Sequence, residues 1–154
     1  MKQYIVKSSK YPAVTVLIDD CDLDFFESRK WSLVANGRYV GESKKTRHRL
    51  HRLLLNPGPK EIVDHINGNA FDNRRCNLRV VSHKQNNRNS KCRDNTTSKF
   101  KGVYRNKYGN WVAQIYIDGV RTHIGIFKVE KDAALAYNTL AKSHWGEYAK
   151  LNIL

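Results

Sequence analysis

Residues 63–80, VDHINGNAFDNRRCNLRV, gather side chains that could together cut a phosphodiester bond. Such a bond is hydrolysed when a base activates a water and a cation neutralises the charge on the departing oxygen. His65 is of the right type for the base, and Asp64 for the cation. Mg²⁺ prefers oxygen ligands and often takes one or two carboxylates, with substrate phosphates completing its shell. The stretch therefore indicates metal-assisted hydrolysis, with an amide oxygen as a candidate second ligand.

The adjacency of Asp64 and His65 limits how such a site can form. Neighbouring side chains of a regular strand point to opposite faces, so both can serve one site only where the strand ends or bulges. The Asn67-Gly68 turn signal makes an end there reasonable. Taken singly, these residue types are more often turn formers than parts of a site. We interpret four of them as loop-shaping, because such side chains bond readily to their own backbone: Asn67, Asn69, Asp72 and Asn73.

The elements around this stretch are predicted from short apolar runs. EIVDHI and NLRVV predict two strands joined by the polar loop, and SHKQNNRNS, with Ser82 as a candidate N-cap, predicts a helix. Upstream, AVTVLI predicts a strand, and a short helix follows whose N-cap candidates are Asp19 and Asp20 and whose apolar face extends to Trp31. Asn36-Gly37 predicts a hairpin, and RHRLHRLLL predicts a helix that two prolines end.

A change of composition divides the chain. SKCRDNTTSK has almost no apolar side chain, so we predict a first domain at 1–90, a basic polar linker at 91–98 and a second domain at 99–154. Within the second domain, three alternating runs separated by turns at Gly109 and Gly119 predict a three-stranded antiparallel sheet. An apolar stripe in KVEKDAALAYNTLAKSHWG predicts a helix that covers one face of this sheet.

The charge balance favours an anionic partner. Lys and Arg number 28 against 14 Asp and Glu, a formal net charge of +14, which points to nucleic acid before any neutral small molecule. A membrane partner is disfavoured, because the chain has neither a long apolar run nor a basic amphipathic helix. MKQYIVKSSK lacks the features of a secretory signal, so we expect the protein to stay inside the cell. Cys21, Cys76 and Cys92 form no CxxC pair and are expected to be free thiols.

In order and spacing, DHINGN, DNR, NLR and QNNRN resemble the HNH endonucleases, in particular their phage and intron-encoded homing branch. That family has a ββα-metal motif, a hairpin and a helix clasping one metal ion, which the resemblance places at about residues 60–90. It implies that His65 is the general base and that Asp64 and Asn86 hold one divalent ion, Mg²⁺ or Mn²⁺. It also implies that Asn77 orients the loop and His65 through hydrogen bonds to backbone.

Other polar residues near the motif have open roles. His51 in HRLLL fits a recurrent position ahead of the motif, whereas His48 and His83 are interpreted as exposed or backbone-contacting. Four arginines are candidate phosphate contacts, although solvated arginines are an equally good interpretation of the first three: Arg74, Arg75, Arg79 and Arg88.

The second domain resembles the Apetala-type DNA-binding domain of plant ethylene-responsive transcription factors, through GVY, NWVAQI, IGIF, DAALAYN and YAKLN. This resemblance implies a three-stranded sheet in the major groove with one helix behind it. Tyr104 and Tyr116 stand where the plant pattern has arginines, which puts the plant base preference in doubt; Tyr104 could equally pack the sheet. The outward face of the strands is expected to hold the DNA contacts: Arg105, Lys107, Trp111, Gln114, Tyr116, Arg121 and His123.

The expected fold class is α+β, a small ββα-metal nuclease domain with N-terminal strands and helices, followed by a three-stranded antiparallel sheet packed on one helix. The expected function is a site-directed, divalent-metal-dependent homing endonuclease acting on double-stranded DNA. The alternative is a catalytically inert, sequence-specific DNA-binding regulator; RNA binding is weaker, since no RNP-like sheet signature is present. We expect a monomer if the enzyme nicks, whereas cutting both strands would need a dimer or a second cleavage event. The expected location is the cytoplasm of a bacterial host.

Overall fold

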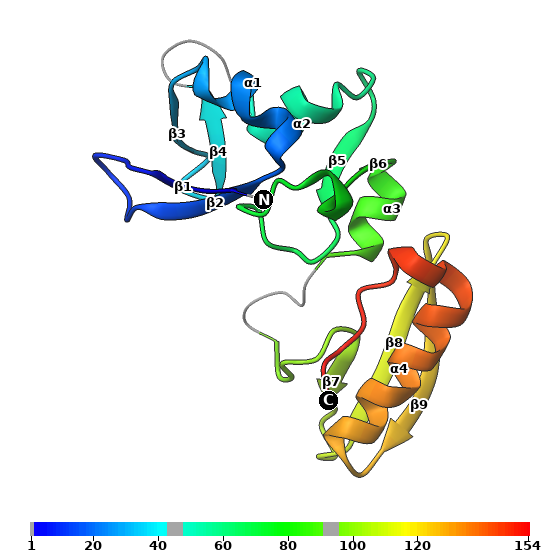
Figure 1. The fold of residues 1–154 in the computed structure, drawn as a ribbon. Helices are drawn as coiled ribbons and strands as arrows, with labels where there is room; N and C mark the ends of the chain where they lie inside the picture. Colours follow the sequence, from blue (N-terminus) through cyan, green and yellow to red (C-terminus); the bar gives the residue numbers. More distant parts are fainter. Residues whose placement is uncertain (1, 43–47, 91–95) are drawn as a thin grey trace. The chain divides into compact units, whose positions relative to one another are not determined.

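The computed structural model describes residues 2–42, 48–90 and 96–154. The chain forms two compact units, Met1–Asn86 and Asn87–Leu154 (Figure 1). Each unit has its own hydrophobic core. The mixed α and β content and the three-stranded antiparallel sheet that the sequence predicts are confirmed. None of the helices in these ranges is long and apolar enough to cross a membrane.

The first unit begins with two small antiparallel pairs. The hairpin at Asn36-Gly37 is confirmed, and Asn36 and Gly37 have the positive φ values of 59° and 79° that a tight turn of this kind requires. A short 3₁₀ segment at Asp20–Asp22 leads into the first helix. The elements are, in chain order, β1 (Lys2–Val6), β2 (Val14–Ile18), α1 (Leu23–Glu27), β3 (Trp31–Val34), β4 (Tyr39–Glu42) and α2 (Leu50–Leu55).

Two details of this segment differ from the prediction. Trp31 does not belong to the helix, because α1 ends at Glu27 and Trp31 begins β3. Its ring still packs on Phe26, at 5.2 Å between ring centroids, and its indole N–H donates to the Phe26 carbonyl at 2.7 Å. Asp19 precedes the 3₁₀ segment but makes no side-chain capping bond there. The helix α1 therefore ends before Trp31, the residue to which the spacing of apolar side chains extended it.

The predicted order of strand, loop, strand and helix across the motif is confirmed. β5 (Ile62–His65) pairs with β6 (Leu78–Val81), and α3 (His83–Arg88) follows. Ser82 is the N-cap, since its hydroxyl accepts the Gln85 N–H at 3.3 Å while the Gln85 side chain accepts the Ser82 N–H at 2.9 Å. β5 ends at His65 and a turn with Gly68 at φ 73° follows, which is the strand end that the adjacency of Asp64 and His65 requires.

The second unit is a meander covered by one helix. β7 (Val103–Arg105), β8 (Trp111–Ile117) and β9 (Val120–Phe127) lie in that order, and α4 (Glu130–Trp145) follows. The small face of α4 lets it approach the strands closely, with Ala133, Ala134 and Ala141 fully buried. Gly102 is required at this contact, because a Cβ there would lie 2.2 Å from the Tyr137 ring.

The predicted linker overlaps the second unit at its C-terminal end. Residues 91–95 lie outside the described ranges. Thr97 and Ser98, however, belong to the second unit: the Thr97 hydroxyl accepts the Arg105 N–H at 2.8 Å, and the buried Ser98 hydroxyl donates to Glu130 at 2.7 Å. Polar composition alone therefore does not separate a linker from a hydrogen-bonded segment that lacks apolar side chains.

Candidate active site and nucleic-acid interface

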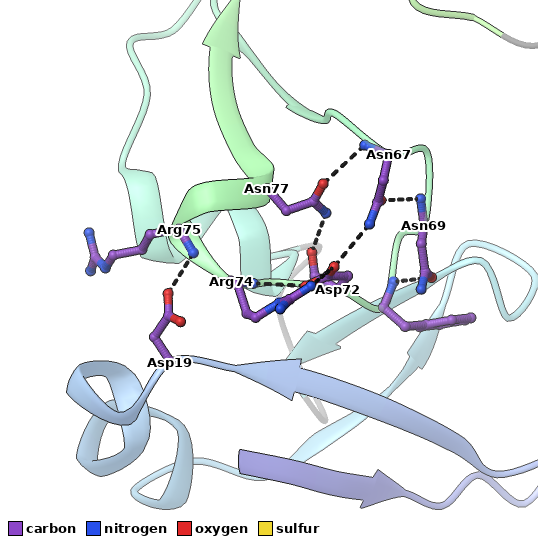
Figure 2. Close-up of polar contacts among 8 residues, drawn as sticks. Asp19, Asn67, Asn69, Asp72, Arg74, Arg75 and Asn77 are labelled. Carbon is purple, nitrogen blue, oxygen red and sulfur yellow. Dashed lines mark hydrogen bonds and ion pairs between the residues drawn. The ribbon is translucent and has the colours of Figure 1, made fainter. Parts of the chain in front are cut away.

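Asn77 ties together the two ends of the motif loop. It is only 6% exposed; its side-chain oxygen accepts the Asn67 N–H at 3.0 Å, and its amide N–H donates to the Asp72 carbonyl at 2.8 Å (Figure 2). The Asn77 carbonyl accepts the Ile66 N–H at 2.9 Å, just beyond β5. A buried amide with both functions satisfied in this way fixes the chain directly after His65.

The loop-shaping interpretation of the other polar residues is confirmed by their hydrogen bonds. The Asn67 side chain accepts the Asn69 N–H at 2.8 Å, and the Asn69 side chain accepts the Phe71 N–H at 3.1 Å (Figure 2). Each asparagine therefore forms a turn with the backbone two residues later, and the two turns follow each other. Asp72 is fully buried and receives two 2.7 Å bonds from the Arg74 guanidinium. The hydrogen bonds from Arg74 lower the pKa of the Asp72 carboxyl.

A distant part of the chain braces this loop. In β2, the Leu17 N–H donates to the Phe71 carbonyl and the Leu17 carbonyl accepts the Asn73 N–H, both at 2.9 Å. Asp19 accepts the Arg75 N–H at 2.7 Å (Figure 2), and the Arg75 guanidinium makes bonds of 2.7 and 2.9 Å to the buried carboxylate of Asp22. The N-terminal hairpin is therefore part of the site's framework, a role that no local sequence signal indicates.

His65, the candidate base, is 6% exposed. Its Nε2 lies 3.4 Å from the side-chain oxygen of Asn73, and its ring meets the His51 ring edge-on at 4.9 Å between centroids. Burial lowers the pKa of His65 below its ordinary value, although Asn73 and the nearby Asp64 and Asp72 oppose the shift. The ring is consequently neutral near pH 7, the state in which it can accept a proton.

His51 is buried more deeply, at 3% exposed, in the first turn of α2. Burial lowers its pKa to about 3, and the positive charges of His65, when protonated, and of Arg49 and Arg52 act in the same direction. Its ring also packs on Tyr39, at 5.4 Å between centroids. His51 is thus a buried, neutral ring that packs against His65.

Asp64 faces Arg79, its partner in the β5–β6 register. The Arg79 guanidinium makes bonds of 3.0 and 3.2 Å to one oxygen of the Asp64 carboxylate, and both side chains are largely buried. Arg79, predicted to contact phosphate, therefore stands beside the candidate metal ligand. Two more of the candidate arginines are also paired with carboxylates, Arg74 with Asp72 and Arg75 with Asp22.

The donor set fits a divalent ion that the substrate would help to hold. Asn86, the candidate second ligand, is half-buried on α3 and its N–H donates to the Ser82 carbonyl at 3.0 Å. Across the described ranges, no group of three or more His, Cys, Asp or Glu side chains could hold a metal by itself. One carboxylate and one amide oxygen match the few protein ligands with which Mg²⁺ is often bound beside phosphate oxygens.

The outward face of the second unit's sheet carries part of the predicted contact set. The β7–β8–β9 register places Gln114, Tyr116, Arg121 and His123 opposite the face that α4 covers, with Tyr104 beside them. Arg121 donates to the Gln114 side chain at 2.6 Å and to the Tyr104 hydroxyl at 3.2 Å. These side chains form a hydrogen-bonded polar surface.

The predicted face is wrong for three residues. Trp111 packs in the core with Val103 and Ala113, because positions 111 and 113 alternate with 114 and 116 along β8. Arg105 pairs with Trp111 in the register, lies on the same side, and its guanidinium donates to the Gly109 carbonyl at 3.1 Å. Lys107 is exposed in the turn between β7 and β8. Within the second unit, Arg88 pairs with Asp118 at 3.7 Å and lies over the Trp145 ring.

Of the three cysteines, Cys21 and Cys76 are exposed free thiols, as predicted, and Cys92 lies outside the described ranges. His48 and His83 are both exposed, which agrees with their interpretation.

Comparison with known proteins links the first unit to a nuclease family. The family model described as HNH endonuclease matches residues 56–88, a segment that includes Asp64, His65, Asn77 and Asn86 but not His51. An uncharacterized HNH endonuclease of Acanthamoeba polyphaga mimivirus is 32% identical over 141 residues, which are 83% of this chain and 73% of that protein. No solved structure matches the chain.

Partial similarity to plant proteins is also found. Dehydration-responsive element-binding protein 2D of Arabidopsis thaliana is 39% identical over 62 residues, 39% of this chain and 30% of that protein. An AP2/ERF and B3 domain-containing transcription factor of the same plant is 49% identical over 43 residues, 28% of this chain and 12% of that protein. This chain therefore spans only a minor part of each plant protein.

Proposed function

The chain belongs to the HNH endonucleases and is a DNA-cleaving hydrolase, and from that premise we propose that it is a divalent-metal-dependent endonuclease of the homing type with His65 as its general base. One observation carries this proposal: a buried imidazole, held neutral, ends β5 directly after the carboxylate of Asp64, on a loop that Asn77 fixes at both ends. A neutral, fixed base beside an oxygen ligand is what hydrolysis of a phosphodiester requires.

In this mechanism His65 takes a proton from the water that attacks the phosphorus. Asp64 and Asn86 would hold the divalent ion, Mg²⁺ or Mn²⁺, which supplies charge stabilisation at the scissile phosphate and the departing oxygen when bound. Asn77 keeps the backbone after His65 in place through its bonds to Asn67 and Asp72. Arg79, within 3.0 Å of the Asp64 carboxylate, orients that carboxylate.

We further propose that the second unit binds double-stranded DNA as an Apetala-type domain and brings the nuclease to its target, with the whole acting as a monomer when it nicks. The outward-facing set of Tyr104, Gln114, Tyr116, Arg121 and His123 supports this, since an antiparallel ribbon with such side chains fits the major groove. The partial similarity to plant DNA-binding proteins supports it as well. The family favours this enzyme over the inert regulator.

The test is cleavage of supercoiled plasmid carrying the genomic DNA that flanks the coding sequence, with Mg²⁺ or Mn²⁺ and with EDTA. A positioned base contributes about 10²–10⁴ in rate, so His65→Ala should cut at least about 100-fold more slowly, while its affinity for the same DNA stays nearly unchanged. His83→Ala, an exposed histidine on α3, is the matched control and should cut at the wild-type rate. Cleavage by His65→Ala at full speed would refute the assignment.

A further inference from the structure

We propose that Asn73 and His51 are positioning residues that hold the His65 ring in a single orientation with its proton on Nε2, so that Nδ1 receives the proton of the attacking water. This inference rests on the proposed role of His65 as the general base. It concerns two residues that act through His65: Asn73, which the sequence indicates only as a loop former, and His51, which lies outside the segment that matches the nuclease family.

The orientation of the Asn73 amide selects the tautomer of His65. The Asn73 amide N–H donates to the Ala70 carbonyl at 3.4 Å, and its oxygen lies 3.4 Å from His65 Nε2. A flipped amide would set its oxygen against the Ala70 carbonyl, two acceptors with no proton between them. The oxygen therefore faces His65, and a neutral imidazole satisfies it only by carrying its proton on Nε2.

Asn73 has little freedom to change this arrangement. Its side chain and backbone are 1% exposed, and its N–H donates to the Leu17 carbonyl of β2 at 2.9 Å. The preceding residue, Asp72, is equally buried and is bonded to Arg74, Asn67 and Asn77. The acceptor that faces His65 is thus anchored from two parts of the chain, which keeps its position fixed.

His51 forms a second wall of the cradle around the base. Its ring meets that of His65 at 77°, with 4.9 Å between centroids, and is itself backed by Tyr39. An edge-on ring blocks rotation of the imidazole without taking its proton. With a pKa of about 3, His51 also stays neutral when His65 becomes charged, so the contact adds no repulsion.

The consequence for catalysis is a choice between two nitrogens. With the proton on Nε2, the lone pair that accepts a proton is on Nδ1, and the Nε2–H bond to Asn73 stabilises the imidazolium that forms. If the proton moves to Nδ1, that nitrogen cannot act as a base, although the fold is unchanged. Positioning of this kind should affect the rate of the chemical step rather than the binding of DNA.

Nitrogen-15 spectra of the ring nitrogens test the tautomer directly, without metal or DNA. The full chain is labelled at its six histidines, and His65→Gln assigns the His65 signals by their loss. We expect Nε2 of His65 to be protonated and Nδ1 to be unprotonated near neutral pH. Asn73→Leu, which removes the acceptor, should give a mixture of tautomers. Asn69→Leu is the matched control in the same loop and should leave the spectrum unchanged.

Cleavage of the same plasmid supplies the second readout. Loss of part of the contribution of a positioned base should lower kcat of Asn73→Leu about 10-fold and leave KM within about 2-fold. His51→Ala should lower kcat in the same way, and His51→Phe, which keeps a ring against His65, should restore most of it.

The outcomes separate this inference from the proposed function. Protonation of wild-type His65 on Nδ1, or an Asn73→Leu variant with unchanged spectrum and kcat, overturns the positioning role while leaving His65 as the base. Full cleavage by His65→Gln refutes the general base itself, whatever its tautomer. If Asn73→Leu does not fold, the tautomer in the wild-type spectrum and the kcat values of His51→Ala and His51→Phe still test the positioning role.

Discussion

The arginines beside the motif loop and the arginine on the outward face of the second unit's sheet are held in opposite ways. In the first unit, Arg74, Arg75 and Arg79 are each paired with a carboxylate, and the carboxylates of Asp22, Asp64 and Asp72 are buried. In the second unit, Arg121 is exposed and its described partners, Gln114 and Tyr104, are neutral. A paired guanidinium contributes rigidity, whereas one with neutral partners keeps its charge for a phosphate or a base edge. The contrast agrees with the proposed division of roles, in which the first unit cuts DNA and the second unit binds it.

The largest effect should come from Asn77→Ala, which removes the amide that closes the motif loop. The Asn67 N–H and the Asp72 carbonyl would both lose a buried partner, and each unsatisfied group costs about 1–3 kcal/mol, so the first unit should lose about 2–6 kcal/mol of unfolding free energy. Denaturant unfolding followed by a probe in the first unit measures this. Asn69→Ala, an exposed residue of the same loop, should cost far less; equal losses would contradict the argument.

Acid should destabilise the first unit selectively through His51. The pKa of His51 is about 3 in the folded chain and near 6.5 when unfolded, so the unfolded state binds the extra proton and stability falls as pH drops from 6.5 toward 3. At about pH 5 the loss should be about 2 kcal/mol. Thermal melts across this range should show a shallower fall for His51→Phe than for wild type. Identical slopes would mean that His51 is already charged, or not buried, in the folded chain.

Two matched substitutions test the contrast between the paired arginines of the first unit and Arg121, and the first of them is Arg75→Gln. This change leaves the buried Asp22 carboxylate without its bidentate partner and should cost about 1 kcal/mol, a modest value because the Arg75 side chain is 49% exposed and water screens the pair. DNA affinity should change little. A large loss of affinity with unchanged stability would move Arg75 into the DNA contact set.

Arg121→Gln should have the reverse effect. It removes a charge whose described partners are neutral, so stability should hardly change, whereas the slope of log affinity against log salt should fall by about 1 if one phosphate contact is lost. Binding of a DNA duplex at several salt concentrations measures the slope. A stability loss with an unchanged slope would show that Arg121 serves the sheet and not the DNA.

The parts of the fold that sequence predicted are those specified by neighbouring residues. The hairpin at Asn36-Gly37 and the cap at Ser82 each depend on the conformational preference of one or two residues. The ordered motif elements located Asp64, His65 and Asn77 in the same way, because their spacing is short and fixed. The error at Trp111 was avoidable, since it alternates with Gln114 and Tyr116 along a single strand.

The brace of the site could not be predicted, because its partners are far apart in the chain. Asp19 had a local interpretation as an N-cap, yet its carboxylate bonds to Arg75, 56 residues later. Nothing in the spacing of Leu17 and Asn73 indicates that β2 would lie along the motif loop. Asn152 is a similar case in the second unit, where its side chain bonds the Lys101 backbone at 2.7 and 3.1 Å. Each of these contacts joins residues that are far apart in the chain, and local sequence patterns do not indicate which distant segments come together.

Sequence by itself determined which residue types stand in order around the end of one strand. It also determined the strongly positive net charge, which favours DNA as the partner. Local backbone preferences and hydrophobic periodicity are sufficient for the first of these, since they act over a few residues. Only the tertiary structure decided that His65 is buried, that Asn73 and His51 enclose it, and that Asp64 faces Arg79. Burial and the hydrogen bonds of a ring depend on which distant segments pack together, and these set its protonation state.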